Sequence, residues 1–391
     1  MPNPTPIRVG IIGASGYSGE TLLSLLANHP YAEVAAVTSR EQIGASLQER
    51  LPLLRQRLPR LSFIPSDPNR LAKKDDINVW FLALPHGVAT DFARPLIEAG
   101  RRVIDLSADF RLGSVETYEA YYGSRHPDPD LMLKTPYVLP EIKVDTSWKS
   151  ASLIASPGCY PTSIIVPMVP LLREKAIDPT NIVINSISGI SGAGKKADLF
   201  YSFCERSNSC TTYGVPKHRH LSEIEEQLSH ALGEPVTVQF TPHLAPIQRG
   251  ILTTIVVPMK VPSIEALYEI WNKAYGKSRF VHLLSSKTFP DTAHVVGTNR
   301  LDLSAVYDDR TGKVVIHSAL DNLIKGAGGQ SIQIMNHWFG FPEDAGLIWT
   351  VGVNTKTLSL DAVLQAIDGI SLICNRFQQY AYAWGFFEDF L

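Results

Sequence analysis

One cysteine lies in a setting that favours nucleophilic chemistry. Cys159 belongs to the segment SPGCYPTS, directly after an apolar run and directly before a helix-like run. A thiol at the N-terminus of a helix gains thiolate character from the helix dipole, and a thiolate readily attacks an acyl carbon. Backbone N–H groups of this turn, with the Ser163 hydroxyl, form a candidate oxyanion site. A single cysteine is more often a small buried apolar residue, so this hypothesis depends on its neighbours.

Two histidines supply candidate proton-transfer groups. His218 and His220 lie in KHRHLSEI, at the start of a helix predicted over 221–231. Glu223 follows His220 at the spacing that places two side chains on one helix face, so we expect this carboxylate to orient the His220 ring. The histidines are two positions apart and are expected on different faces. We therefore assign acid–base catalysis to His220 and substrate positioning to His218 and Glu223. The reverse assignment of the histidines, or a merely polar helix start, stays open.

A glycine-rich turn near the N-terminus indicates dinucleotide binding. Glycines fall at every third position in VGIIGASGYSGE, between a strand-like run and a helix-like run. Glycines there let the backbone approach a pyrophosphate, which is held at the positive N-terminus of the helix. We expect cofactor contacts from Gly13, Ser15, Gly16, Tyr17, Ser18 and Gly19. The spacing is GxxGxxG rather than GxGxxG, so a glycine-rich turn without a ligand is the alternative.

The end of the second strand-like run favours NADP(H). An NAD site places an acidic residue there to bind the ribose 2′-hydroxyl, whereas this chain has Ser39 and Arg40. A hydroxyl followed by a guanidinium suits a 2′-phosphate, and an ordinary solvated arginine is the alternative. The segment Leu84, Pro85, His86 ends another strand-like run, where cofactor-facing loops belong.

Three cationic side chains are candidates for holding the anionic groups of a substrate. Arg111 ends DLSADFR, and Arg249 lies in PHLAPIQRGI just before a strand-like run. Lys195 lies in SGISGAGKK, which begins at Ser188, another candidate substrate contact. This glycine-rich segment is equally compatible with a flexible loop that binds nothing.

The elements that must position these residues divide the chain into two parts. Before residue 160, apolar strand-like runs alternate with helical runs, which predicts an α/β unit with a parallel sheet covered on both faces. The strand-like runs are 7–12, 33–38, 78–84 and 102–106, and the helical runs are 18–28 and 88–99. Beyond residue 163, longer strand-like runs predict an α+β unit with a mostly antiparallel sheet. These strand-like runs are 181–190, 235–241, 250–258 and 313–320, and the helical runs are 164–175, 264–275 and 327–338.

Composition narrows the class of protein. The chain has 391 residues, 45% of them hydrophobic, and its 36 Lys and Arg against 38 Asp and Glu leave a net charge of −2. This balance argues against disorder and against a nucleic-acid partner. Four cysteines without paired spacing indicate neither a disulfide framework nor a metal site, and we expect Cys204 and Cys210 to be structural. No signal-like segment is present, and prolines interrupt the uncharged run 150–172, so we expect a soluble, cytoplasmic protein with no membrane contact.

These motifs together resemble the N-acetyl-gamma-glutamyl-phosphate reductase family, a relative of aspartate-semialdehyde dehydrogenase. The segments that carry the resemblance are GIIGASGYSGETLLSLLANHP, FLALPHG, VIDLSADFR, SPGCYPTS, SISGISGAGKK, KHRHLSEI, FTPHLAPIQRGI and DNLIKGAGGQSIQIMN. The resemblance implies NADPH-dependent reduction of N-acetyl-glutamyl phosphate to the semialdehyde in arginine biosynthesis, with Cys159 as the thioester-forming nucleophile and His220 as the acid–base residue. It also implies cofactor contacts from Gly192, Asn322 and Gln330.

The resemblance further implies a two-domain homodimer or homotetramer. A Rossmann-type NADP-binding domain is expected over 1–158, completed by the returning helix near 327–338, with a catalytic, substrate-binding and dimerisation domain over 159–326. Residues 347–391 form an aromatic-rich tail that matches nothing expected of the family. The alternatives are another semialdehyde dehydrogenase, such as one acting on aspartyl phosphate, and a non-catalytic dinucleotide sensor. Whether the substrate carries an acetyl group or a carrier protein also stays open.

Overall fold

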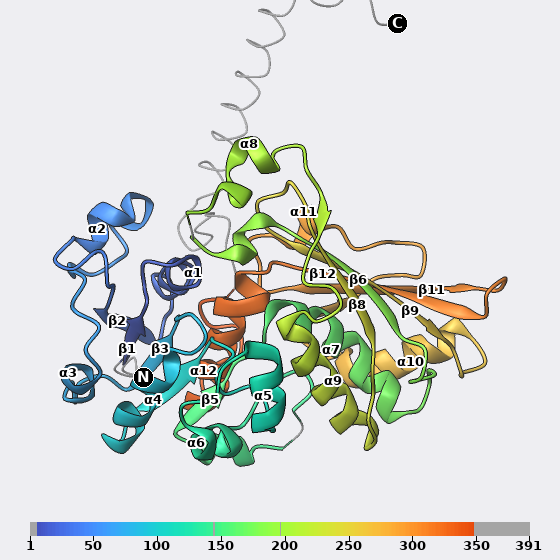
Figure 1. Cartoon of the computed structure of the whole chain (residues 1–391), viewed down its shortest axis with the longest axis horizontal. Coiled ribbons are helices and arrows are strands. Elements are labelled where there is room, and N and C mark those ends of the chain that lie inside the picture. Colours follow the sequence, from blue (N-terminus) through green and yellow to red (C-terminus); the bar gives the residue numbers. More distant parts are fainter. Residues whose placement is uncertain (1–5, 144, 196, 348–391) are drawn as a thin grey trace, which may run out of the picture. The chain divides into compact units, whose positions relative to one another are not determined.

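The first part of the chain folds around a five-stranded parallel sheet (Figure 1). The computed structural model describes residues 6–143, 145–195 and 197–347. The strands follow the order β2-β1-β3-β4-β5, and every neighbouring pair is parallel. They are β1 (Ile7–Ile12), β2 (Ala32–Val37), β3 (Val79–Leu82), β4 (Arg102–Asp105) and β5 (Leu153–Ala155). Because β2 and β3 lie on opposite sides of β1, a crevice forms at the carboxyl end of β1, where ligands bind in such sheets.

Helices complete this part. The ten-residue helices α1 and α4 follow β1 and β3, and their apolar residues pack on the sheet. The helices are α1 (Tyr17–Leu26), α2 (Leu47–Arg50), α3 (Pro68–Ala72), α4 (Ala89–Glu98), α5 (Val115–Tyr122) and α6 (Pro129–Lys134). The predicted parallel α/β unit is confirmed, because apolar runs long enough only for short buried strands alternate with amphipathic runs.

The second part contains a seven-stranded mixed sheet of order β10-β11-β12-β9-β6-β8-β7. Its strands are β6 (Val183–Ser188), β7 (Thr211–Thr212), β8 (Gln239–Leu244), β9 (Ile251–Pro258), β10 (Val281–Leu283), β11 (Leu301–Asp308) and β12 (Lys313–Leu320). Only β10–β11 and β6–β8 pair in parallel, so the mostly antiparallel prediction is confirmed. The sequence did not predict β11, whose buried Asp302 and Ser304 interrupt its apolar pattern.

Three helices cover one face of this sheet (Figure 1). They are α7 (Cys159–Arg173), α9 (Arg219–Leu232) and α10 (Ile264–Tyr275). Along β9, fully buried residues alternate with partly exposed ones, as expected for a strand with one covered face. The short helices α8 (Phe203–Arg206) and α11 (Thr292–Val295) lie in connections. Helix α7 begins at Cys159 rather than at residue 164, which places the cysteine itself at the helix N-terminus.

The chain then returns toward the first sheet. A short π-helical turn, η5 (Ile324–Gly328), leads into α12 (Gly329–Phe339), where a single helix was predicted. Ile332, Ile334 and Met335 of α12 belong to the same apolar cluster as residues of β1 and α1. Within the described ranges, no helix is both long enough and apolar enough to cross a membrane. Apart from Leu347, the predicted tail lies outside the described residues.

Candidate active site

Cys159 is the first residue of α7, directly after the turn that leaves β5. Gly158, in extended conformation, precedes the helix, and its N–H donates a hydrogen bond of 2.8 Å to Glu223 Oε1. The Thr162 hydroxyl donates to the Gly158 carbonyl at 2.9 Å. The residue before the nucleophile is therefore held at both its N–H and its carbonyl, and the half-buried thiol of Cys159 is free.

Small residues allow three segments to meet at this turn. A Cβ atom on Gly158 would lie 2.7 Å from His220 Nε2 and 2.8 Å from Arg111 Nη1, so a larger residue there would displace both side chains. On the other side, a Cβ atom on Gly326 would lie 2.6 Å from Cys159 Cβ. Cys159 consequently lies between α9 and η5, and the backbone of η5 approaches it closely at Gly326.

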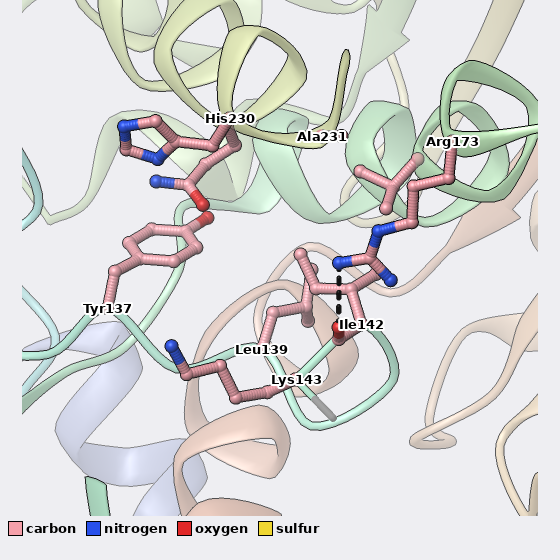
Figure 2. Close-up of a pocket in the computed structure, with 9 residues that line it drawn as sticks. Tyr137, Leu139, Ile142, Lys143, Arg173, His230 and Ala231 are labelled. Carbon is pink, nitrogen blue, oxygen red and sulfur yellow. Dashed lines mark hydrogen bonds between the residues drawn. The ribbon is translucent and has the colours of Figure 1, made fainter. Parts of the chain in front are cut away.

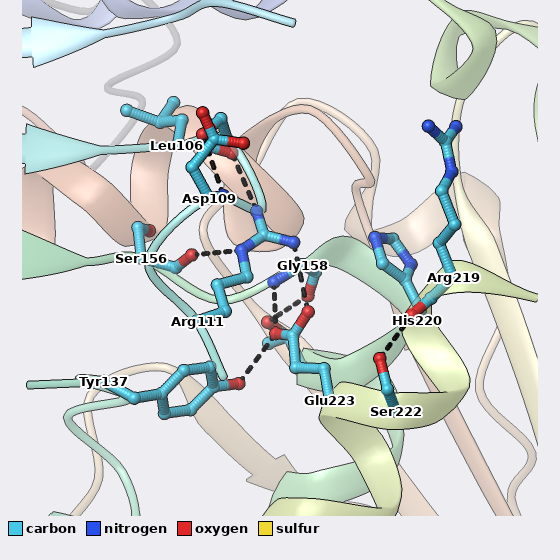
Figure 3. A network of polar contacts seen from close by, with 12 residues as sticks. Leu106, Asp109, Arg111, Tyr137, Ser156, Gly158, Arg219, His220, Ser222 and Glu223 are labelled. Atoms are coloured by element: carbon cyan, nitrogen blue, oxygen red, sulfur yellow. Dashed lines mark hydrogen bonds and ion pairs between the residues drawn. The ribbon is translucent and has the colours of Figure 1, made fainter. Parts of the chain in front are cut away.

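Glu223 binds different partners from those expected. Its carboxylate accepts hydrogen bonds from Gly158 N–H, from the Tyr137 hydroxyl at 2.9 Å and from Arg111 Nη1 at 3.1 Å (Figure 3). No hydrogen bond joins it to His220 in the part of the chain that the structure describes, so the prediction that it orients this ring is wrong. Burial and the Glu223 charge raise the pKa of Tyr137, which keeps its hydroxyl protonated as a donor. Glu223 thus fixes the nucleophile turn rather than the imidazole.

Arg111 is built into the same network. Its Nε donates to the Ser156 carbonyl at 2.9 Å and its Nη2 donates to the Leu106 carbonyl at 2.7 Å, in addition to the ion pair with Glu223 (Figure 3). Both members of this ion pair are buried. The sequence suggested that the Arg111 guanidinium binds the substrate. In the structure it joins the carboxyl ends of β4 and β5 to α9.

The two histidines lie together, although their spacing suggested separate faces. His218 precedes α9 with extended backbone, and its Nδ1 accepts a hydrogen bond of 3.1 Å from the His220 N–H. Because His218 lies outside the helix, its ring centroid is 5.1 Å from that of His220. The ring of His218 also contacts Tyr160, Tyr213 and Phe240. His220 Nδ1 is buried and has no hydrogen-bond partner among the described residues.

Burial sets the protonation of these groups. It raises the pKa of the Cys159 thiol to about 11, and the Tyr160 N–H and the Arg111 charge offset only part of the rise. The expected low thiol pKa is therefore wrong, because loss of water outweighs the helix dipole. Burial, followed by the Arg219 charge, lowers the pKa of His218 to about 4, and burial lowers the pKa of His220 well below 6.5. At neutral pH the site holds a thiol beside neutral imidazoles.

Three further expectations about this region changed. The Ser163 hydroxyl is fully buried and already bonded to the Tyr160 carbonyl and the Thr253 hydroxyl, so it is not placed to bind an oxyanion. Cys204 and Cys210, expected to be structural, are both exposed.

The glycine-rich turn has the geometry of a phosphate cradle. Gly13 has φ +83°, and a Cβ atom on it would lie 2.4 Å from the Ala83 carbonyl oxygen. A Cβ atom on Gly19 would lie 2.5 Å from the Gly13 carbonyl oxygen, so helix and turn pack closely. A Cβ atom on Gly16 would meet only the Gly13 carbonyl oxygen, at an ordinary contact distance of 3.7 Å, and no side chain caps the N-terminus of α1 behind it. The uncapped N–H groups are thus available to an anion.

The residues predicted to select the cofactor lie beside this cradle. The hydroxyls of Ser15 and Ser39 are 2.9 Å apart, and Ser39 Oγ also accepts the N–H groups of Glu41 and Gln42. Arg40 follows and is exposed. Tyr17 and Ser18 open α1 at the mouth of the cradle, with Tyr17 exposed.

The other predicted cofactor residues fall into two groups. The first group follows β3. A Cβ atom on Gly13 would lie 3.2 Å from a methyl group of Leu84. His86, which follows Pro85, forms a hydrogen bond with Arg219 of α9. Asn322 accepts the Gly250 N–H at 2.8 Å and donates to Ser191 beside Gly192.

Gln330 stands apart from these residues. It is fully buried in the first turn of α12, and both polar atoms of its amide have no partner among the described residues. A buried amide without partners is costly, so a polar group bound beside it would offset that cost.

The predicted substrate-binding residues lie at different depths. Ser188 is buried at the end of β6, and its hydroxyl donates to the Gly189 carbonyl. Lys195 pairs with Glu20 of α1 and lies over the Tyr17 ring, so the loop after β6 reaches the cofactor helix. Arg249 is partly exposed, 3.8 Å from the buried carboxylate of Asp321.

A separate surface pocket of about 150 Å³ opens between α7 and α9 (Figure 2). Residues that line it include Tyr137, Leu139, Lys143, Arg173 and His230. It contains none of the predicted site residues, although the hydroxyl of Tyr137 bonds Glu223. The candidate site is therefore identified by the polar network around Cys159 and not by this pocket.

Sequence reasoning missed Tyr137, Ser156, Glu141 and Lys325. Tyr137 and Ser156 act through a hydroxyl and a carbonyl that bond distant residues, for which no local motif exists. Lys325 lies inside DNLIKGAGGQ, where no local pattern distinguishes it. Its complete burial, which distinguishes it, is visible only in the structure. Ser331 of the predicted returning helix donates to Ser156 Oγ at 2.9 Å.

Comparisons with known proteins identify the family to which the chain belongs. Residues 8–149 match the family model of the semialdehyde dehydrogenase NAD binding domain, and residues 159–322 match that of the semialdehyde dehydrogenase dimerisation domain. The N-acetyl-gamma-glutamyl-phosphate reductase of Akkermansia muciniphila is 47% identical, covering 87% of this chain and 98% of that protein. The protein of the same name from Geotalea daltonii is 44% identical with the same coverage.

Solved structures share the fold. Aspartate semialdehyde dehydrogenase II of Vibrio cholerae, complexed with ASA, has a TM-score of 0.63 at 17% identity, covering 85% of this chain and 98% of that one. The Candida albicans aspartate semialdehyde dehydrogenase with NADP has a TM-score of 0.64 at 17% identity, covering 85% and 99%.

Proposed function

The chain belongs to the N-acetyl-gamma-glutamyl-phosphate reductase family, and from this premise we propose how its residues carry out the reaction. The protein is an NADP-dependent oxidoreductase that reduces N-acetyl-glutamyl 5-phosphate to N-acetyl-glutamate 5-semialdehyde and releases phosphate, a step of arginine biosynthesis. The observation that carries the mechanism is the free thiol of Cys159 at a helix N-terminus, in a turn against which His220 Nε2 packs.

The first step forms a thioester. Because burial keeps the thiol protonated, His220 must accept its proton as the sulfur attacks the acyl-phosphate carbon. A lowered imidazole pKa leaves His220 neutral and able to accept. The sulfur–carbon bond forms, the bond from carbon to the phosphate oxygen breaks, and phosphate leaves. His220 now carries the thiol proton.

The second step reduces the thioester. NADPH, when bound, supplies the hydride that a thioester carbon accepts more readily than a carboxylate carbon. His220 donates its proton to the oxygen of the resulting hemithioacetal. When the carbon–sulfur bond breaks, this proton returns to the sulfur, and the aldehyde and the original thiol are restored. One histidine therefore moves one proton in both directions.

The cradle at α1 fits the cofactor. The uncapped N-terminus of α1, which follows Gly16, suits a pyrophosphate, and the buried amide of Gln330, which has no partner among the described residues, suits a polar partner. Gly13 and Gly19 permit the tight turn, and Ser15, Ser18 and Tyr17 line its mouth. Ser39 and Arg40 would bind the 2′-phosphate. Leu84, Pro85, His86, Gly192 and Asn322 complete the proposed set.

We assign substrate binding to polar side chains from several segments of the chain. Lys195 and Arg249 would hold the anionic groups, with Ser188 beside them. His218, packed against Tyr160 and hydrogen-bonded to the His220 backbone, would position the substrate. Arg111 and Glu223 shape this site as a buried ion pair.

We also propose the domain boundaries and the assembly. Residues 1–158 with the returning segment near 327–338 would bind cofactor, and residues 159–326 would bind substrate and dimerise. The sheet face opposite α7 carries partly exposed apolar residues, including Ile187 at 38% exposure, as a homodimer or homotetramer interface would. Ile187→Asp should lower the mass measured by light scattering, and an unchanged mass would place the interface elsewhere.

We further propose that the protein works in the cytoplasm, because a reducing compartment keeps a reactive thiol such as that of Cys159 from forming disulfides.

The reverse reaction tests the function. Purified protein should reduce NADP⁺ when N-acetyl-glutamate semialdehyde and phosphate are both present, and aspartate semialdehyde should support little reduction. A preference for aspartate semialdehyde would move the chain to the other semialdehyde dehydrogenases. Absence of any NADP⁺ reduction, with cofactor binding retained, would favour a non-catalytic dinucleotide sensor.

A further inference from the structure

A buried lysine lies one residue before the glycine that contacts the nucleophile. Lys325 of η5 is fully buried, and its ammonium group is bonded to the Glu141 carboxylate, which is 2% exposed. The same ammonium donates to Gln333 Oε1 at 2.7 Å and lies over the Phe280 ring. Withdrawing both charges from water is costly, and the steps proposed above use neither group.

The segment that Lys325 anchors joins the two reacting parts of the site. Gly326 contacts Cys159 at the start of α7 at the close approach described above. Two residues later, a Cβ atom on Gly328 would lie 3.2 Å from Thr21 Cγ2 and 3.5 Å from the Leu22 nitrogen, both in α1. A single short turn of chain therefore touches the nucleophile helix and the cofactor helix at once.

Backbone hydrogen bonds of wide spacing hold the turn itself. The N–H groups of Gly326, Gly328 and Gly329 bond the carbonyls of Asp321, Leu323 and Ile324, which is the spacing of a π-helical turn, a rare arrangement. Its sequence is Ile-Lys-Gly-Ala-Gly, so Lys325 is its one side chain able to make directional bonds. Upstream, Asp321 caps the turn and Asn322 fastens it to Gly250.

Glu141 and Gln333 complete the anchor from two other parts of the fold. Glu141 Oε1 also accepts the Gln333 side-chain N–H at 2.8 Å, so the three side chains close a ring of bonds. Gln333 belongs to α12 and is further bonded to Asn299 and Glu343. The position of Lys325 is therefore set by the body of the protein and not by η5.

We propose that Lys325 and Glu141 are positioning residues that hold η5 so that Cys159 and the bound nicotinamide lie at hydride-transfer distance. The inference rests on the proposed function of Cys159 and of the cradle at α1. Lys325 acts through the Gly326 backbone and touches no reacting atom. Removing the pair should slow hydride transfer and leave thiol reactivity and cofactor affinity unchanged, since the thiol, His220 and the cradle keep their own contacts.

The test separates these quantities in the reverse direction. Stopped-flow absorbance records the first turnover of NADP⁺ reduction on mixing with N-acetyl-glutamate semialdehyde. The main variant is Lys325→Met/Glu141→Met, which removes the pair without leaving one buried charge alone. Lys273→Met is the matched control, because Lys273 forms an ion pair with Glu174 but is exposed.

A misplacement of about 1 Å costs roughly a hundredfold in rate, so the double variant should reduce NADP⁺ roughly ten- to a hundredfold more slowly in the first turnover. Deuterium at the aldehyde carbon should then slow it further. NADP⁺ affinity by fluorescence titration and the rate of Cys159 alkylation by iodoacetamide should match wild type. Lys273→Met should match wild type throughout.

Two results from the double variant would overturn the proposal. A folded double variant that transfers hydride at the wild-type rate would make the pair purely structural. Parallel losses of alkylation, cofactor affinity and hydride transfer would show a general distortion instead of a positioning effect.

If the double variant does not fold, Glu141→Gln takes its place, because glutamine keeps an oxygen acceptor for Lys325. This variant should show the same selective loss of hydride transfer to a smaller degree. A Glu141→Gln variant without that loss would equally overturn the proposal. A wild-type protein without a first turnover would contradict the proposed function itself.

Discussion

The turn that carries Cys159 and the turn that forms the cofactor cradle both lie between a strand and a helix, yet they are built differently. Side chains from distant segments hold the cysteine turn, through the bonds of Glu223 to Gly158, Arg111 and Tyr137. Glycines and uncapped backbone N–H groups shape the cradle, and its nearby side chains Tyr17 and Arg40 are exposed.

The difference shows how one fold separates binding from chemistry. A phosphate needs N–H donors and space, which backbone geometry alone supplies. A nucleophile needs a nearby proton acceptor and a fixed direction, and buried, hydrogen-bonded side chains such as Glu223 and Arg111 supply the fixed direction. Substitutions at the cysteine turn should therefore lower kcat, and substitutions at the cradle should mainly raise KM for the cofactor.

Cys159→Ser should show the largest effect. An alcohol is a much weaker nucleophile than a thiol beside a base, so turnover should fall by several powers of ten while NADPH affinity stays unchanged. Steady-state assay and fluorescence titration measure the two quantities. A variant that retains more than about a hundredth of the rate would remove covalent catalysis from the account.

His220→Asn should come next. It keeps a hydrogen-bonding side chain but cannot exchange protons, so turnover should fall roughly a hundred- to ten-thousandfold with KM for the substrate little changed. His218→Asn should instead raise KM for the substrate more than it lowers kcat. The opposite pattern would transfer the acid–base role to His218.

Arg40→Ala should affect only the cradle. KM for NADPH should rise roughly tenfold to a hundredfold, the value of one charge-assisted contact to the 2′-phosphate, while KM for NADH hardly changes. Both constants come from initial-rate measurements with each cofactor. Equal effects on the two cofactors would make Arg40 structural and weaken the contrast between the regions.

The smallest effect concerns pH. Because burial lowers the pKa of His220 below the ordinary 6.5, the acid limb of kcat/KM should lie below pH 6.5. The free energy of unfolding should also decrease on acidification. Between pH 6.5 and about 4, the unfolded chain binds a proton at His218 that the folded protein does not bind, so the folded protein loses stability as the pH falls. Urea unfolding of wild type and His218→Asn checks this, since the variant should lose less stability on acidification. Equal losses in the two proteins would contradict the lowered pKa.

Local patterns in the sequence predicted much of this molecule. The apolar run of β1, the glycine turn and the amphipathic α1 follow one another along the chain, so periodicity and spacing sufficed to predict this strand, turn and helix. The position of Cys159 at a helix N-terminus was also predicted, although α7 begins earlier than the apolar run suggested.

Long-range contacts account for what the sequence did not predict. Glu223 pairs with Arg111 and Tyr137, which lie far away along the chain, and a helical spacing to His220 carried no information about them. The thiol pKa moved opposite to expectation because its burial depends on η5 and α9 packing around it. Asp302 in β11 is tolerated in a buried strand because Arg300 pairs with it.

The thioester on Cys159 is the central claim, and intact mass tests it directly. Protein incubated with NADP⁺ and N-acetyl-glutamate semialdehyde, without phosphate, should form one NADPH per active thiol and gain the mass of one N-acetyl-glutamyl group at Cys159. Phosphate should then remove the added mass. NADPH formation with no added mass, or with the mass on a residue other than Cys159, would contradict the account.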